Sequence, residues 1–374
     1  MNDKPYNYKE LRMKGKVRLN AVGDLMLGDF PLTLGFGVRS SIREKIDGNP
    51  FNKIKHVLMN CDICFGNLET VLSDYGLKNN DIKSAQMRGD PCFVELLKDA
   101  GFNVMSIANN HAMQHGPEAF IETKEGLIQG GIAPIGIVGA NRRVVPHFME
   151  VNCLRVCFLG YSLRPEKYCP QILYAQPNVW EIVEDIKLNK ARSDIVIVSL
   201  HWGDEFVQLP SPEQIRSAHS FIDAGASLVI GHHPHMVQGI ERYKDGVIAY
   251  SLGNFIFDYW QNKLRKTIIL HCELSIKGVE SFDITTAYIG KDFNPIVLYG
   301  SKSNALSLMV DSLSKKIEKI DTNSYKQERK YLLSVKTGLL INKVQNRIYF
   351  LKNIFKYERW VVIQSIRNFI NLHF

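Results

Sequence analysis

Short apolar runs rich in Val, Ile and Phe recur along the first 260 residues, and polar, helix-like segments separate several of them. We expect each run to form a buried strand: 17–23, 61–67, 103–109, 155–161, 194–201, 227–233 and 247–254. Residues 91–101 and 212–225 instead show the spacing of amphipathic helices. This alternation predicts an α/β fold with a largely parallel sheet, or two stacked sheets, with helices outside.

The second predicted helix has clear boundary signals. Ser211 is a good N-cap, Pro212 suits the first helical position, and Gln214 stands where a capping box needs it. Gly225 closes the segment. These residues predict a helix that begins at 212 and ends just before 225.

The pattern changes near the C-terminus. Ile341, Val344, Ile348, Leu351 and Phe355 recur at spacings of three and four, and the segment is rich in Lys and Arg. A basic amphipathic helix of this kind suits an anionic membrane surface, a helix packed on the body, or a short coiled-coil dimer. We divide the chain into a main domain at 17–297 and a basic helical extension at 298–374.

Composition places the chain among globular proteins: 374 residues, 45% hydrophobic and 22% charged. The formal net charge of +8 is concentrated in residues 301–374, which hold fourteen Lys and Arg against five Asp and Glu. The rest is close to neutral, which disfavours a nucleic-acid partner. A polar N-terminus and seven irregularly spaced cysteines predict reduced thiols in the cytoplasm.

Metal-competent or acid–base side chains follow five of the predicted strands, and ligand sites form outside the carboxyl ends of strands in such sheets. These residues are Asp24, Asn67, Glu69, Asn109, Asn110, His111, His201, His232, His233 and His235. Imidazole and carboxylate together suit Mn²⁺, Zn²⁺ or Fe²⁺. The sequence therefore predicts a site for one or two divalent ions.

Other residues are candidates to shape that site. Trp202 could wall a pocket, and Glu205 could serve as a general base or orient a ligand. Arg88 could hold an anionic substrate with its fork of donors. We add His232, Ser251 and Asn254 to the expected substrate-binding residues.

Six ordered motifs carry a resemblance to a known family: AVGDLMLGD, FGNLET, SIANNHAMQHG, SLHWGDEF, GHHPHMVQGIE and IAYSLGNFIFD. Through these six motifs the chain resembles the capsule-synthesis CapA/PgsA proteins. The resemblance implies a metallo-dependent-phosphatase-like α/β/β/α sandwich. It also implies a role in making poly-γ-glutamate or another capsular polymer.

The wider calcineurin-like phosphoesterases carry a similar motif series, and the likeness implies metal ligands and an acid. The implied ligands are Asp24, Asn67, Glu69, Asn110, His201, His233 and His235, and His111 is the implied general acid. Two positions depart from the series: Met26 replaces a histidine, and Asn67 replaces a bridging aspartate. A neutral Asn67 bridges two cations poorly. Glu69, two residues later in the sequence, can supply the missing carboxylate.

Two functions follow as hypotheses. One is a metal-dependent hydrolase or transferase in capsular or extracellular polymer biosynthesis, acting on an acidic polymer or another phosphorylated or carboxylated substrate. The other is a non-catalytic assembly factor that binds the polymer or a capsule-synthesis partner. Both place the protein in the cytoplasm, with the extension as a means of attachment to the inner membrane face.

Overall fold

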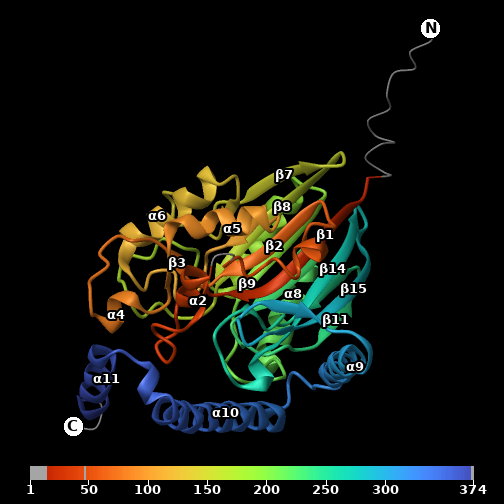
Figure 1. Ribbon diagram of the computed structural model, residues 1–374. Coiled ribbons are helices and arrows are strands. Elements are labelled where there is room, and N and C mark those ends of the chain that lie inside the picture. The colour runs from red at the N-terminus through yellow and green to blue at the C-terminus, as the bar shows by residue number, and fades with distance from the viewer. Residues whose placement is uncertain (1–14, 46–47, 372–374) are drawn as a thin grey trace, which may run out of the picture.

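The computed structural model describes residues 15–45 and 48–371, with the side chains of the last four left out. The polar segment 1–14 and residues 372–374 of the expected extension lie outside this range. Two large β-sheets form the centre of the molecule, and helices flank them (Figure 1).

The first sheet has eight strands in the order β16-β15-β14-β1-β2-β5-β6, with β13 also paired to β1. Its strands are β1 (Val17–Leu25), β2 (Ile63–Leu68), β5 (Val104–Ser106), β6 (Ala133–Ile135), β13 (Asn254–Ile256), β14 (Lys266–Ser275), β15 (Gly278–Ile289) and β16 (Pro295–Val297). Strands β1, β2, β5, β6 and β13 run parallel, as predicted, whereas β14, β15 and β16 are antiparallel.

The second sheet has six strands in the order β11-β12-β10-β9-β8-β7. They are β7 (His147–Val151), β8 (Leu154–Ser162), β9 (Ile195–His201), β10 (Leu228–His232), β11 (Ile240–Tyr243) and β12 (Gly246–Ala249). The central strands β8, β9, β10 and β12 are parallel and almost wholly buried. Burial on both faces explains their continuous apolar runs. A separate pair joins β3 (Val71–Leu72) to β4 (Arg88–Gly89).

Three apolar cores define the layers. Leu19 and Phe65 of the first sheet meet Phe158 and Ile197 of the second in a core between the sheets. A second core lies against α2 (Val38–Glu44), α3 (Lys55–Leu58), α5 (Val94–Asp99) and α6 (Gly116–Gln129), and a third against α7 (Val179–Lys190) and α8 (Pro212–Asp223). The predicted α/β/β/α sandwich is confirmed.

Helix α8 begins and ends where its sequence signals predict. Both bonds of the capping box are present, because Ser211 accepts from the Gln214 N–H and the Gln214 side chain accepts from the Ser211 N–H. Gly225 has a φ of +114°, a conformation that favours glycine. The short α4 (Ile82–Ala85) is capped in turn by Asp81.

Three helices end the chain: α9 (Gly300–Ile317), α10 (Tyr325–Lys352) and α11 (Arg359–Asn371). Figure 1 shows α10 running along one side of the body. It contacts the body through polar, aromatic and small residues. The Gln261 side-chain amide donates to Asn342 at 2.9 Å, Trp260 stacks on Tyr349, and Gly338 lies against Phe206.

The apolar stripe predicted for this segment faces away from the body. Ile341 is 44% exposed, Leu351 67% and Phe355 79%. None of the described helices has the length and apolar composition needed to cross a bilayer.

Candidate metal centre

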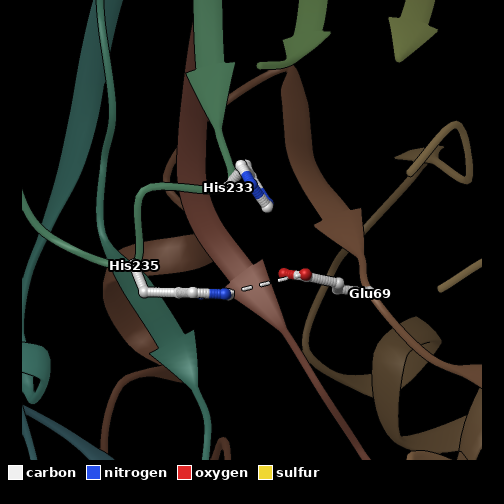
Figure 2. A group of neighbouring side chains, drawn as sticks. All are labelled: Glu69, His233 and His235. Carbon is white, nitrogen blue, oxygen red and sulfur yellow. Dashed lines mark ion pairs between the residues drawn. The ribbon is translucent and has the colours of Figure 1, made fainter. Parts of the chain in front are cut away.

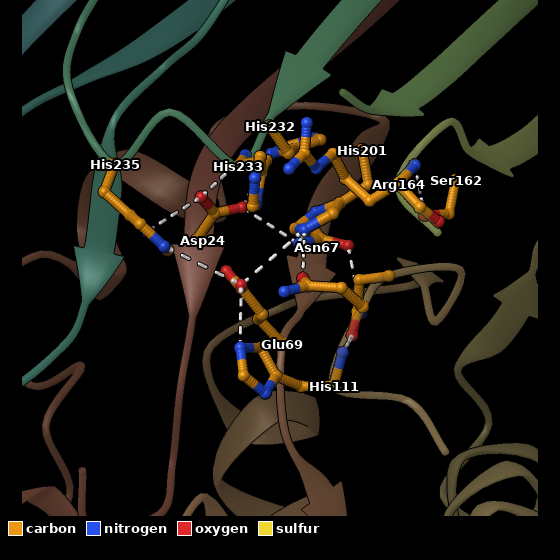
Figure 3. A network of polar contacts seen from close by, with 12 residues as sticks. Asp24, Asn67, Glu69, His111, Ser162, Arg164, His201, His232, His233 and His235 are labelled. Atoms are coloured by element: carbon orange, nitrogen blue, oxygen red, sulfur yellow. Dashed lines mark hydrogen bonds and ion pairs between the residues drawn. The ribbon is translucent and has the colours of Figure 1, made fainter. Parts of the chain in front are cut away.

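The predicted site residues meet because the strand ends of both sheets are in register. In the first sheet, Asp24 pairs with Asn67 and with Asn254. In the second, His201 pairs with His232 on one side and Ser162 on the other. Figure 3 shows these strand ends converging on one buried cluster.

Glu69 lies at the centre of that cluster. It belongs to two groups whose potential ligand atoms all lie within 4.8 Å of one another: Glu69 with His233 and His235, and Glu69 with Asp24 and His201. The carboxylate faces both imidazoles of the first group (Figure 2), with 3.8 Å between Glu69 Oε1 and His235 Nε2. Glu69 therefore supplies a carboxylate common to both groups, which the neutral side chain of Asn67 does not offer.

Several polar atoms of the cluster are buried without hydrogen-bond partners. They include both carboxylate oxygens of Glu69 and both ring nitrogens of His233. Burial, together with Asp24 and Glu205, raises the pKa of Glu69 well above its ordinary value. Burial and neighbouring positive charge lower the pKa values of His201 and His233 well below theirs. Neutral imidazoles around an unpartnered carboxylate fit a divalent cation.

Asp24 organises the loop that carries the histidines. Its Oδ2 accepts from the backbone N–H of His233 at 3.1 Å, and its Oδ1 lies 3.2 Å from His232 Nδ1. Burial alone would raise the pKa of Asp24, but its contacts with His232, His235 and Asn67 lower it. The loop is strained, because His233 and His235 have φ values of +95° and +56°.

Two asparagines expected as ligands are engaged in hydrogen bonds. Asn67 donates through Nδ2 to Asp24 Oδ1 at 2.9 Å, and its Oδ1 accepts from Asn109. Asn110 Oδ1 accepts from His201 Nε2 at 2.7 Å. Both side chains contact other candidate ligands, Asp24 and His201, and their own role as metal ligands stays a prediction.

Asn254 likewise contacts a candidate ligand, and the substrate contact expected of it stays a prediction. Its Oδ1 accepts from His235 Nδ1 at 2.9 Å, which leaves Nε2 of that ring facing Glu69. The buried side chain of His232 lies against Asp24 and Phe65, and its expected role in substrate binding also stays a prediction.

His111 is adjacent to the cluster, with Nε2 3.8 Å from Glu69 Oε1. Its Nδ1 donates to Gln114 Oε1 at 2.7 Å. Burial lowers the pKa of His111 to about 4, so the ring is neutral near pH 7. The general-acid role that the motif implies for His111 stays a prediction.

Three more predicted substrate-binding residues make structural contacts. Arg88 is buried and donates to the backbone carbonyls of Ser84, Ser73 and Tyr75 at 2.8–2.9 Å. Trp202 is buried behind the site, where it stacks on Tyr250 and donates to its carbonyl. Ser251 accepts from the N–H of Gly253 within a turn. All three side chains are buried and engaged in these contacts, which favours a structural role over substrate binding.

A pocket of about 200 Å³ opens beside the cluster. Its lining includes the side chains of Asn110, Arg164, Lys167, Asp204, Glu205, His233 and Leu339. The catalytic role expected of Glu205 stays a prediction. Arg164 and Lys167 were not predicted, although they follow the apolar run 155–161 and the strand-end rule applies to them equally.

The fold and the cluster define a class of protein: a four-layer sandwich whose strand ends gather histidines and carboxylates that fit a divalent cation. Residues 18–259 match the family described as Bacterial capsule synthesis protein PGA_cap. The chain belongs to that family.

Curated relatives agree with this assignment. The chain is 30% identical to the capsule biosynthesis protein CapA of Bacillus anthracis, over 73% of this chain and 67% of that protein. It is 28% identical to the PGA biosynthesis protein CapA of Bacillus subtilis, over 71% and 69%. Among solved structures, a putative 5'-nucleotidase from Staphylococcus aureus matches with a TM-score of 0.47 and 14% identity, over 79% of this chain and 58% of that one.

Proposed function

We propose that this protein acts in the biosynthesis of poly-γ-glutamate or a related capsular polymer, as a metal-dependent hydrolase or transferase. The observation that carries the proposal is Glu69, a buried carboxylate without hydrogen bonds that faces four histidines: His111, His201, His233 and His235. The names of the CapA relatives supply the polymer class.

Five side chains would hold the metal: Asp24, Glu69, His201, His233 and His235. Their mixed imidazole and carboxylate donors suit Mn²⁺, Zn²⁺ or Fe²⁺. When bound, such an ion supplies Lewis-acid polarisation and an acidified water. Because Glu69 belongs to both groups, it can serve one ion or be shared by two.

The chain's own groups supply proton transfer around that centre. Glu205 lines the pocket, and its carboxylate can take a proton from an attacking water or hydroxyl. His111 presents an unprotonated Nε2 to the same region and is held in that tautomer by Gln114. A carboxylate that can take a proton beside a metal suits hydrolysis or transfer at a carbonyl or phosphoryl group.

Metal analysis and turnover together test the proposal. The parent protein should retain transition metal and cleave or transfer synthetic γ-linked glutamate oligomers or a phosphoester substrate. Glu69→Gln should lose the metal, because it removes the shared charge. Glu205→Gln should keep the metal and lose about 10²–10⁴ in turnover.

The assembly-factor function remains the second candidate, because Asn67 donates a hydrogen bond where a bridging carboxylate would bind metal. A parent protein that takes up no Mn²⁺, Zn²⁺ or Fe²⁺ would contradict the enzyme and favour this role. Metal without turnover, together with polymer binding, would favour it as well.

We also propose that α10 rests on an anionic membrane surface. Most of its apolar side chains are exposed, whereas Asn342, Gly338 and Tyr349 contact the body. Lys343, Arg347 and Lys352 are exposed along the same helix. Apolar side chains interspersed with basic ones suit the boundary between lipid headgroups and acyl chains.

A further inference from the structure

Helix α10 forms part of the pocket beside the metal cluster. Leu339 of α10 lines that pocket, opposite residues that follow strands of the second sheet. Tyr331, two turns earlier on α10, donates through its hydroxyl to Asp204 Oδ2 at 2.8 Å. Since α10 lies beyond residues 18–259, this part of the pocket comes from outside the segment that matches the family.

Asp204 connects that helix to an arginine in the pocket. Its Oδ1 accepts from Arg164 Nη1 at 3.2 Å, and the same nitrogen donates to the Gly203 carbonyl at 2.7 Å. Both described side-chain bonds of Arg164 therefore use Nη1. The other edge of the guanidinium keeps its donors for a ligand.

The pocket carries two basic side chains, Arg164 and Lys167, and two acidic ones, Asp204 and Glu205. Asp204 is already bound by Arg164 and Tyr331, which leaves Glu205 as the unpaired acidic group of the pocket. With the remaining donors of Arg164 and the Lys167 ammonium in its wall, the pocket offers a carboxylate or phosphate charge-assisted hydrogen bonds.

We propose that Arg164 binds an anionic group of the substrate in this pocket, and that α10 positions Arg164 through Tyr331 and Asp204. The volume of about 200 Å³ suits one terminal unit of a polymer rather than a long segment. The inference rests on the proposed function for the class of polymer. Anion binding by Arg164 can nevertheless be measured without catalytic turnover.

Calorimetric titration of the full chain tests the binding step. The two probes are a synthetic γ-linked glutamate tetrapeptide and inorganic phosphate, which separate a carboxylate site from a phosphate site. Arg164→Gln should weaken binding of the preferred probe by about 10- to 100-fold, because charge-assisted hydrogen bonds are lost. Arg164→Lys should restore little, since an ammonium lacks the fork of donors.

Lys187→Gln is the matched control. It removes one positive charge from the exposed face of α7 and should leave affinity within about twofold, as expected for a screened surface charge. A parent protein that binds neither probe would overturn the proposal. Equal affinities for Arg164→Gln and Lys187→Gln would overturn it too.

A double-mutant cycle tests the positioning by α10. Tyr331→Phe should weaken binding about two- to fivefold in the parent protein and have no further effect in Arg164→Gln. Additive losses would overturn the positioning role. A parent protein that binds the probes as expected but holds no metal or shows no turnover would instead contradict the proposed enzyme. Failure of the anion-binding proposal and failure of the proposed function are therefore distinguishable.

Discussion

The backbone N–H of His233 donates to Asp24 Oδ2 at 3.1 Å, which joins the loop after β10 to the end of β1. This contact connects the two sheets directly at the cluster of candidate metal ligands. It also holds His233 at a φ of +95°, where a non-glycine side chain is strained. The candidate ligands are therefore held in place before any ion binds, and the strained backbone of His233 lowers the stability of the fold.

Substitution of His233 should separate strain from metal binding. In metal-free protein, His233→Gly should be more stable than His233→Ala by about 1 kcal/mol, because glycine accepts the positive φ. Both variants should bind less metal than the parent protein. Chemical denaturation in a chelating buffer measures the difference, and equal stabilities would argue against strain at this residue.

Arg88 should prove structural. Arg88→Ala should lower the free energy of unfolding by about 3 kcal/mol, since three backbone carbonyls lose a charged donor in a buried site. Its metal content should match that of the parent protein. Lys83→Ala, at an exposed position nearby on α4, should change stability by less than about 0.5 kcal/mol.

The sequence predicted the parallel strands and the histidine cluster for one physical reason. A parallel strand buried on both faces is a continuous apolar run, and its carboxyl end marks where side chains such as His201 must lie. Strand β15 was missed because its buried and exposed positions are mixed along its length. It therefore gives no apolar run.

The site contacts that the sequence did not predict join distant segments. Nothing local to Arg88 reveals that the carbonyls of Ser73 and Tyr75 accept its hydrogen bonds. In the same way, Tyr331 meets Asp204 only because α10 folds back across the body. Periodicity predicted that α10 is amphipathic, but it did not say which face is turned outward.

Acid should destabilise the protein partly through His115. Burial lowers the pKa of His115 to about 4, while its Nε2 donates to the carbonyl of Gln86. As the pH falls, the unfolded chain protonates His115 at a higher pH than the folded protein does. The contribution of the neutral ring to the free energy of unfolding is therefore complete above about pH 6.5 and is lost as the pH falls toward 4.

The difference between His115→Gln and the parent protein isolates that effect. The stability of the variant should depend less on pH between 4 and 6.5, as measured by denaturant unfolding in a chelating buffer. Identical pH profiles for the two proteins would contradict a buried, neutral His115.

The outward face of α10 should bind anionic vesicles. Leu340→Ser with Leu351→Ser should reduce flotation with phosphatidylglycerol liposomes, because both side chains are more than 60% exposed and apolar. Raised salt should weaken flotation of the parent protein. Ile128→Ser with Leu188→Ser, at exposed positions on α6 and α7, is the control and should float like the parent protein.

A parent protein that never floats would contradict the membrane proposal. Deleting residues 331–374 would not test it, because the deletion also removes Tyr357 and Val361, which are buried against Leu34 and Ile82. The truncated protein should therefore melt at a lower temperature than the parent protein, whether or not α10 binds a membrane.

The pocket wall contributed by Leu339 has a consequence for the order of assembly. A ribosome delivers Asp24, Glu69, His201 and the His233–His235 loop well before it delivers α10. The cluster can therefore come together while its pocket still lacks one side. An ion that binds this cluster, as we propose, can therefore reach it from solution before the chain has an enclosed place for an anion.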